Sequence, residues 1–453
     1  MAFIYRILYL KVRYLCGLQI DCSELEYTVK IQTQSFKKTI WSSRKIRATY
    51  VEEITGEIMS TIFTTSIVKE KDSHAAGETL GLEALKKMPT QKPDLAIIFG
   101  SPDYDYKKVF ESFFKIIGEI QIIGCTSAGE FTEKEMSQGG IACAFITSDT
   151  HHFYTGIGIG LQNKQNEAID VALANFPKSV PNFPLQSVML FVDGLTGKGE
   201  EAVQATSRML GGQVKLFGGA AGDNLHFKKT RVFGSGLALS DAVSTCLIAS
   251  KKPIICSVKH GHHPISPALC VTKAKDNVLY EIEGKIALDV WKEYLQDEIQ
   301  EQDWKHLINH SSEFLSKLLM KAGMITGDSY EIRFPISCNP DGSLNFICKV
   351  EKNSLIKIMS TRPSDQITSA LEAAKEALKL AKNEKIAGIV VFDCACRGMI
   401  LKERFSVAVE MIKDIFPDTP MIGVETYGEI LLEPDVLAGG FHNASIVIML
   451  IPE

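Results

Sequence analysis

The sequence predicts an α/β protein of two domains with mixed sheets, built from three strand–helix–strand–loop–strand repeats. Short apolar runs, which favour strands, alternate with amphipathic stretches, which favour helices. A glycine-rich loop that ends in Gly-Glu or Gly-Asp follows the second strand of each unit. The same order of elements recurs at about 95–146, 187–249 and 387–451. Self-similarity of this kind indicates a repeated architecture.

Within each copy, two strands flank a helical stretch, and a third strand follows the loop. The first copy contains LAIIFG, QIIGCTSAGE and IACAFI (Leu95–Gly100, Gln121–Glu130 and Ile141–Ile146). The second contains SVMLFVDG, VKLFGGAAGD and VSTCLIA (Ser187–Gly194, Val214–Asp223 and Val243–Ala249). The third contains AGIVVFDC, PMIGVETYGE and ASIVIMLI (Ala387–Cys394, Pro420–Glu429 and Ala444–Ile451).

Other elements lie outside the copies. Met59–Met88 predicts a strand and then a helix. Lys251–Gly284 alternates and is rich in β-branched residues, so it predicts several strands. Two helices should follow, one in KIALDVWKEYLQDEI and one over Asn309–Ala322. YEIRFPIS and CNPDGSLNFICKVEKNSLIKIMS predict strands around a Pro-Asp-Gly turn, and the alanine-rich SALEAAKEALKLAK predicts a helix that leads into the third copy.

We expect a domain boundary near residue 250, which gives domains over residues 59–250 and 251–453. Residues 1–58 match neither domain: they are locally basic and carry no repeat and no clean period. They form an atypical N-terminal extension. One interpretation is that Met59 is the true start of the protein, and the alternative is a genuine N-terminal arm. We favour the first.

Composition excludes several classes of protein. The chain has 453 residues, enough for two or three domains, and is 45% hydrophobic and 23% charged, as in ordinary globular proteins. A net charge of −5 does not favour nucleic acid, which needs a basic face. No apolar run approaches the roughly 20 residues of a membrane helix, so we expect no membrane insertion. Eleven scattered cysteines without a CxxC favour reduced thiols, and we expect a cytoplasmic protein.

The three glycine-rich loops are the first candidates for a binding site. Glycines let backbone or ligand approach closely, and loops at strand ends often bind ligands in α/β proteins. The terminal acids Glu130, Asp223 and Glu429 have two interpretations: they accept hydrogen bonds from a ligand amine, or they cap N–H groups of their own loops. No GxGxxG or Walker sequence follows a strand, so these loops are not nucleotide fingerprints.

Seven segments, in this order, resemble the signature segments of the FIST family: IIGCTSAGEF, LFGGAAGDN, LYEIEGKIALDVWKEYL, DGSLNFICKVEKNSLIKIM, VVFDCACRGMIL, MIGVETYGEI and GFHNASIVIM. The first two resemble its N-terminal domain and the others its C-terminal domain. The resemblance runs from about residue 60 to the end. It implies an intracellular sensory module of signal transduction that binds small ligands, amino acids among them. Some members resemble haem-binding nitric-oxide sensors that act on a partner histidine kinase.

The chain departs from the family pattern in two places. Gly261-His262-His263-Pro264 stands where the family often has an aromatic and a basic residue after glycine, and Ile286 stands where a proline is usual. These departures bear on the identity of the ligand rather than on the fold.

Further candidate residues lie in the third copy. Arg397 follows a strand, where its guanidinium would either hold a ligand carboxylate or form a structural ion pair. His442 and Asn443 would bind a ligand or fix a turn, and Tyr427 would stack on a ligand or pack in the core. The expected ligand-binding set is Cys125, Thr126, Gly129, Glu130, Gly222, Asp223, Arg397, Tyr427, Gly428, Glu429, His442 and Asn443.

Cofactors and catalysis stay open at this point. We assign no metal and no certain cofactor. Haem is implied only by the resemblance, with His226, His260, His262, His263 and His442 as the histidines to consider. An enzyme using Cys125 or the loop carboxylates is the alternative from another class, because a cysteine at a strand end is a position where a thiolate can be activated.

We expect a cytoplasmic sensor. Its small ligand is amino-acid-like: the three acids take positive groups and Arg397 takes a carboxylate. The copies and the linking segment fill residues 59–453, so we expect the output to pass in trans to a partner protein, such as a histidine kinase of a two-component system. A haem-based nitric-oxide sensor that regulates a histidine kinase is the alternative within sensing.

Overall fold

The computed structural model describes residues 61–88, 92–295, 300, 303–304, 306–307, 321–326, 329–436 and 439–453. Both helices and mixed sheets are present, as the sequence predicts for an α/β protein. The expected extension at 1–58 lies outside the described residues. So does most of the helix expected over Asn309–Ala322; its last two residues begin a strand instead, β18 (Lys321–Thr326). No helix in the described part is both long and apolar enough to cross a membrane.

Three six-stranded sheets contain all of the described strands outside residues 263–360. Sheet 1 has the order β1 (Thr61–Val68), β6 (Ile141–Ser148), β2 (Leu95–Gly100), β3 (Gln121–Thr126), β10 (Val232–Gly234) and β11 (Leu237–Leu239). Sheet 2 has the order β26 (Phe441–His442), β25 (Glu429–Leu432), β9 (Lys215–Ala220), β8 (Leu185–Val192), β12 (Ala242–Ser250) and β7 (His151–Ile159). Sheet 3 has the order β13 (Ile255–His260), β27 (Ser445–Pro452), β23 (Ile386–Cys394), β24 (Met421–Thr426), β4 (Glu130–Thr132) and β5 (Met136–Ser137).

Each of these sheets contains one parallel pair with an antiparallel neighbour. The parallel pairs are β2/β3, β8/β9 and β23/β24, and the antiparallel neighbours are β6, β12 and β27. Whether the three units are true repeats stays a prediction.

The strand after each loop pairs with a different sheet from the strand before it. β3 belongs to sheet 1, but β4, which follows its loop, pairs with β24 of sheet 3. β25 follows the β24 loop and pairs with β9 of sheet 2, and β10 follows the β9 loop and pairs with β3 of sheet 1. This cyclic exchange ties the three sheets together and brings the three loops near their junction.

The core lies where the sheets face one another. Phe99 of β2, Phe191 of β8 and Phe392 of β23 are fully buried and make mutual ring contacts, with centroids 5.7 to 6.3 Å apart. Because strands buried on both faces need apolar residues throughout, these segments are continuous apolar runs rather than alternating ones. This explains why LAIIFG and VMLFV carry no polar face.

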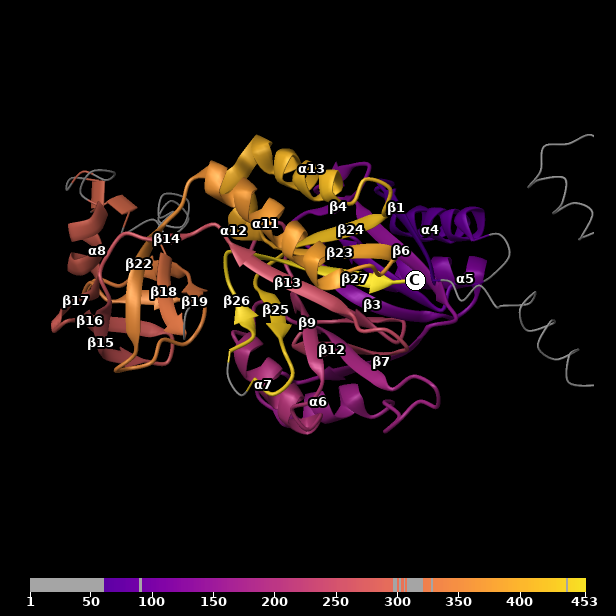
Figure 1. Cartoon of the computed structure of the whole chain (residues 1–453), viewed down its shortest axis with the longest axis horizontal. Helices are drawn as coiled ribbons and strands as arrows, with labels where there is room; N and C mark the ends of the chain where they lie inside the picture. Colours follow the sequence, from indigo (N-terminus) through magenta and orange to yellow (C-terminus); the bar gives the residue numbers. More distant parts are fainter. Residues whose placement is uncertain are drawn as a thin grey trace, which may run out of the picture. The chain divides into compact units, whose positions relative to one another are not determined.

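Helices cover the outer faces of the sheets (Figure 1). α4 (Ser73–Lys87) packs on α5 (Tyr106–Ile117), and α6 (Gln165–Leu173) packs on β7 and on α7 (Gly199–Met209). α11 (Pro363–Ala381) packs on β13, β27 and α13 (Phe405–Ile415). α11 uses a stripe of small residues, Ala370, Ala373, Ala374, Ala377 and Ala381, which lets the helix approach the sheet closely.

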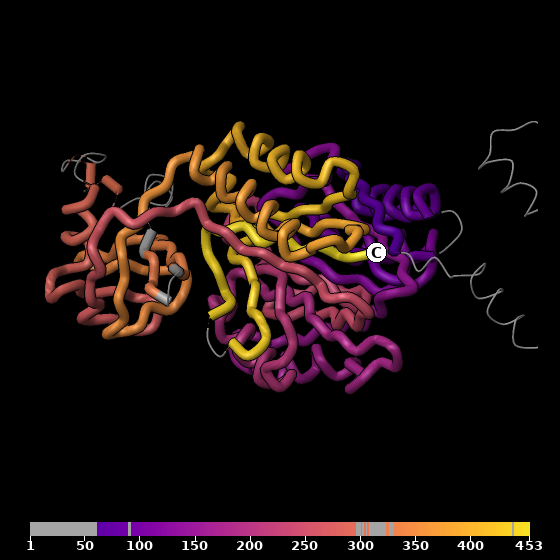
Figure 2. Tube along the Cα trace, viewed as in Figure 1, coloured from indigo at the N-terminus to yellow at the C-terminus, as the bar shows by residue number. Residues whose placement is uncertain are grey.

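Residues 263–360 form a smaller unit, which we call the β-subdomain. Its nine-stranded sheet has the order β19 (Ser329–Arg333), β18, β22 (Leu355–Ser360), β15 (Leu269–Lys275), β16 (Val278–Ile282), β21 (Leu344–Phe346) and β20 (Pro335–Cys338), with β14 (His263–Pro264) on β22 and β17 (Lys285–Ile286) on β16. α8 (Ala287–Leu295) packs there through Trp291, in a core of its own. The chain enters this unit between β13 and β14, at 260–263, and leaves it between β22 and α11, at 360–363. Figure 2 shows the chain crossing over at these two places.

Candidate functional site

Three adjoining cavities lie at the carboxyl ends of the parallel pairs β8/β9 and β23/β24, the place where open α/β sheets bind ligands. The apolar chamber encloses about 180 Å³. The acidic chamber, about 470 Å³, shares Leu225, Ala395 and Met399 with it. The outer chamber, about 350 Å³, shares Ile347 and Tyr427 with the apolar chamber. We call the three together the strand-end crevice.

The apolar chamber has walls from two parts of the chain. Phe334, Ile336 and Ile347 come from the β-subdomain. The opposite wall comes from the loop after β9, from α12 (Ala395–Leu401) and from Tyr427, whose ring stacks on Phe227 at a centroid distance of 4.9 Å. A ligand held here would contact both parts at once.

The three loop acids are satisfied by the protein itself. Glu130 accepts hydrogen bonds from Ser127 Oγ at 2.6 Å and from the N–H of Gly140 at 2.7 Å, and burial raises its pKa. Glu429 accepts from Thr426 Oγ1 at 2.9 Å and Ser445 Oγ at 2.7 Å, and burial raises its pKa well above the usual value. Both acids are therefore held by hydroxyl groups and by N–H groups outside their own loops, and the prediction that they accept from a ligand amine stays a prediction.

Asp223 plays the same part in the second loop. Its carboxylate accepts hydrogen bonds from the N–H groups of Phe227, Lys228 and Lys229 and from the hydroxyl of Tyr427. Burial opposes ionisation, but the Tyr427 hydroxyl and these N–H groups outweigh it and lower the pKa of Asp223. Asp223 therefore fixes the loop that carries Phe227 into the apolar chamber.

Arg397 is fully buried and bound within the protein. Its Nε donates to Asp393 Oδ1 at 2.6 Å, and its Nη1 donates to Gln366 Oε1 and Ser369 Oγ, each at 2.6 Å. Of the two interpretations given to Arg397, this arrangement is the structural ion pair. The prediction that Arg397 also holds a ligand carboxylate is not tested by it and stays a prediction.

Only three of the predicted residues line the crevice. Tyr427 and Asn443 face the apolar chamber, and Glu130 faces the acidic one. Asn443 Oδ1 accepts from Cys348 Sγ at 3.4 Å, and His442 Nε2 lies 3.1 Å from the Leu431 carbonyl. The predicted residues that do not line the three chambers are Cys125, Thr126, Gly129, Gly222, Asp223, Arg397, Gly428, Glu429 and His442.

Glu425 lines the acidic chamber and was missed by the sequence analysis. It lies on β24 with 8% of its surface exposed, and burial, together with the charges of Asp393 and Glu130, raises its pKa to about 8. A signal was present in the sequence: a carboxyl group near the end of MIGVET, a buried strand whose first four residues are apolar.

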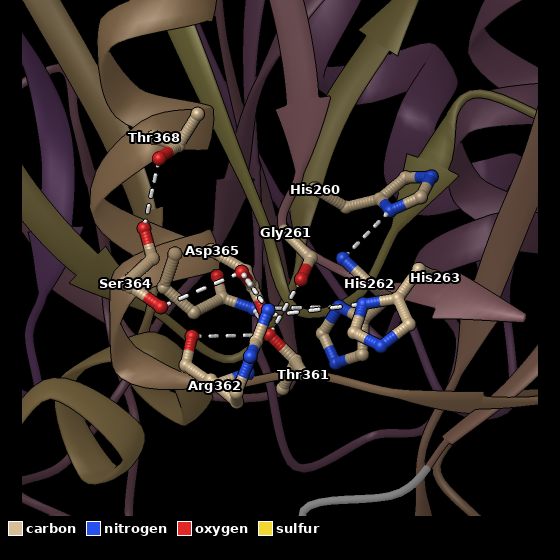
Figure 3. Close-up of polar contacts among 10 residues, drawn as sticks. His260, Gly261, His262, His263, Thr361, Arg362, Ser364, Asp365 and Thr368 are labelled. Carbon is tan, nitrogen blue, oxygen red and sulfur yellow. Dashed lines mark hydrogen bonds and ion pairs between the residues drawn. The ribbon is translucent and has the colours of Figure 1, made fainter. Parts of the chain in front are cut away.

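A polar network joins the two crossings to the β-subdomain, and Figure 3 shows its part around Gly261 and Thr361. The hydroxyl of Thr361 donates to the Gly261 carbonyl and accepts from Gln366 Nε2 at 2.8 Å. Gln366 in turn holds Arg397. Gly261 is required by close approach, since an added Cβ would lie 2.7 Å from the backbone of Asp365. The two crossings are therefore fastened to each other and to the strand that ends at the crevice.

The histidines considered for haem lie away from the crevice, and Cys125 is not an activated thiolate. None of His226, His260, His262, His263 and His442 lines the three chambers. The haem alternative stays a prediction, and we derive no step through haem. Cys125 is fully buried, and burial raises the pKa of its thiol, the opposite of activation. No cluster of three metal-ligating side chains occurs among the residues described.

Family models settle the relationship. A FIST N domain matches residues 94–285, and a FIST C domain matches residues 287–431. The chain belongs to the FIST family. FIST domains are associated with sensory signal transduction and small-ligand binding. In this general sense, the protein is a sensory protein.

Other comparisons add little about function. This FIST protein is 21% identical over 377 residues to the uncharacterized protein MJ1623 of Methanocaldococcus jannaschii, covering 74% of this chain and 69% of that one. A cyanuric acid hydrolase from A. caulinodans aligns with a TM-score of 0.32 and 7% identity, over 87% of this chain and 100% of that one. PurLQS from Thermotoga maritima aligns with a TM-score of 0.21 and 8% identity, over 87% of this chain and 72% of that one.

Proposed function

We propose that this FIST protein is a cytoplasmic sensor that binds a small molecule in the strand-end crevice and signals in trans to a partner protein, such as a histidine kinase. One observation carries the proposal: the apolar chamber has Phe334, Ile336 and Ile347 of the β-subdomain on one side and α12 on the other. A ligand that contacts both sides has a different affinity for each relative placement of the two walls. That difference is what lets binding shift a conformational equilibrium.

The network at the crossings supports the same proposal. Asp393, which holds Arg397, stands next to Cys394, which lines the apolar chamber. Arg397 reaches Gln366 on α11, and Gln366 reaches Thr361 in the crossing. A chain of hydrogen bonds therefore joins the chamber wall to the segment through which the chain leaves the β-subdomain.

Two further parts of the proposal come from the sequence. The division into an N-terminal domain over residues 59–250 and a C-terminal domain over residues 251–453 places the crevice between residues of both. The cytoplasmic setting is supported by the described cysteines, such as Cys125, Cys246 and Cys348, which are free thiols.

A blocking variant tests the proposal. Ala395 is 3% exposed and lies between the apolar and acidic chambers, so Ala395→Trp fills the shared wall. We expect a panel of amino acids, amines, organic acids and nucleosides to include at least one compound that raises the Tm of the wild type, because a ligand of the native state stabilises it. The same compound should leave the Tm of Ala395→Trp unchanged. A compound that shifts both proteins equally would place binding outside the crevice.

A further inference from the structure

Glu425 is a buried carboxyl group that the fold leaves without a partner. It is 8% exposed, and no hydrogen bond to its side chain is found among the residues described. Its backbone is fully used, since its N–H donates to the Gly129 carbonyl at 2.7 Å and its carbonyl accepts from Ala128 at 2.9 Å. A buried polar group usually finds a partner, so this one calls for an explanation.

Two glycines shape a slot for this carboxyl group. A Cβ at Gly129 would collide with Glu425 Oε1, and a Cβ at Gly398 would collide with Oε2. Gly398 lies on α12 and also lines the acidic chamber, together with Glu425. The oxygens are therefore held between a loop and a helix and face a cavity of about 470 Å³.

The charges around the slot favour a cation. Asp393 and Glu130 are the acids whose charges act on Glu425. Arg397, the nearby buried cation, is committed to Asp393 at 2.6 Å. Lys402 also lines this cavity, but its side chain is exposed to solvent. Carboxyl groups therefore outnumber basic ones around the acidic chamber, and a positively charged group would balance them.

An apolar space adjoins this acidic one. Leu225, Ala395 and Met399 line both chambers, so a molecule placed in one reaches the other past these side chains. Beyond them lie the rings of Phe227 and Tyr427. The two chambers together therefore offer one ionisable carboxyl group beside an aromatic and aliphatic wall.

We propose that the crevice binds a primary amine with an apolar body, with its ammonium group paired to Glu425 and its body against Met399 and Tyr427. This inference rests on the proposed ligand-sensing function and assigns the chemical class of the ligand.

Proton release accompanies such binding. The pKa of Glu425 is raised to about 8 by burial and by the neighbouring acids, so its carboxyl group is mostly protonated at pH 7 in the free protein. An ammonium group stabilises the carboxylate form, because an opposite charge at close range favours ionisation. Binding at pH 7 should therefore release close to one proton.

Calorimetry with matched probes tests the inference. The probes are 2-phenylethylamine, a cation, and 2-phenylethanol, its neutral analogue. The proteins are wild type, Glu425→Gln, Ala395→Trp, and Glu403→Gln as a control that removes one exposed acid beside Lys402. Titrations in phosphate and in Tris give the number of protons released.

We expect the wild type to bind the amine at least tenfold more tightly than the alcohol. Glu425→Gln should weaken the amine tenfold or more, leave the alcohol unchanged and abolish proton release, whereas Glu403→Gln should behave as wild type. Amine affinity of the wild type should rise from pH 6 to pH 8, since Glu425 ionises over that range, and that of Glu425→Gln should stay flat.

The outcomes separate this inference from the proposed function. One outcome is that the wild type binds the amine and the alcohol equally well and that Ala395→Trp binds neither. This result would overturn the pairing of an ammonium group with Glu425 but would keep the crevice as the ligand site. Amine binding that survives in Glu425→Gln at full strength would do the same. If neither probe binds the wild type, the inference fails, and the compound panel on wild type and Ala395→Trp then decides the proposed function separately.

Discussion

Replacement of Arg397 by alanine should destabilise the protein severely. The guanidinium is fully buried and makes three hydrogen bonds of 2.6 Å, one of them to Asp393. Removing it leaves the Asp393 carboxylate buried without its cation. Breaking a buried ion pair in this way costs about 3–5 kcal/mol, because the remaining charge keeps its desolvation penalty and loses its partner.

The assay is urea unfolding followed by circular dichroism. Arg397→Ala should lower the free energy of unfolding by about 3 kcal/mol or more. Arg397→Lys should cost less, since an ammonium group keeps the charge but lacks the planar fork that reaches Gln366 and Ser369 together. The double variant Asp393→Asn/Arg397→Met should recover much of the loss, because it leaves no unpaired buried charge.

A cost below about 1 kcal/mol for Arg397→Ala, the size seen for exposed ion pairs, would refute the reasoning. So would a double variant that is no more stable than Arg397→Ala alone. Either result would mean that an unpaired buried charge does not account for the effect of Arg397→Ala.

Three further predictions follow from buried groups. Glu425→Gln should gain stability relative to wild type as pH rises. The pKa of Glu425 is raised to about 8 in the folded protein, so the folded protein keeps a proton that the unfolded chain releases above its usual pKa. In urea unfolding, the difference in the free energy of unfolding should grow by about 1.4 kcal/mol per pH unit between pH 5 and pH 7. A flat difference would contradict this burial of Glu425. Gly423→Ala should destabilise by about 2 kcal/mol, since its Cβ would overlap the ring of Phe131; an unchanged urea midpoint would argue against that contact. Cys125 should resist a thiol reagent in the native state while the partly exposed Cys396 reacts, as mass spectrometry of the labelled peptides would show, and early labelling of Cys125 would contradict its burial.

The α/β class and most strands could be predicted because buried strands consist of consecutive apolar residues, which can be recognised in the sequence. LAIIFG became β2, and IVVFDC forms the end of β23. The helix over SALEAAKEALKLAK also follows from local composition, and α11 contains it. Periodicity and helix propensity act over a few residues, so a single sequence is enough to recover them.

The partners of those strands could not be predicted. Nothing in the sequences EFT and EILL shows that β4 pairs with β24 and that β25 pairs with β9, each in a different sheet from the strand that precedes it. Pairing between strands far apart in sequence depends on the whole packing, which no local pattern records. The cyclic exchange of strands among the three sheets is therefore a finding of the structure alone.

The candidate site was recovered in part. The loops were placed correctly at strand ends, but the sequence could not decide whether their acids face a ligand or the loop. Glu130, Asp223 and Glu429 each find donors that lie several residues away or further, such as Gly140, Lys228 and Ser445. Glu425 lies within GVETYGE, but the sequence pattern singles out only the acid that ends each loop, here Glu429.

Hydrogen–deuterium exchange of the full chain, with and without saturating 2-phenylethylamine, tests most directly whether ligands bind between the two walls of the crevice. The account predicts slower exchange in peptides that cover 334–347 of the β-subdomain. In the same experiment, exchange should also slow over 394–399, at the start of α12, and over 424–427, at the end of β24. Slower exchange confined to other regions, such as the open cavity near Thr65 and Glu83, or no change at all, would contradict it.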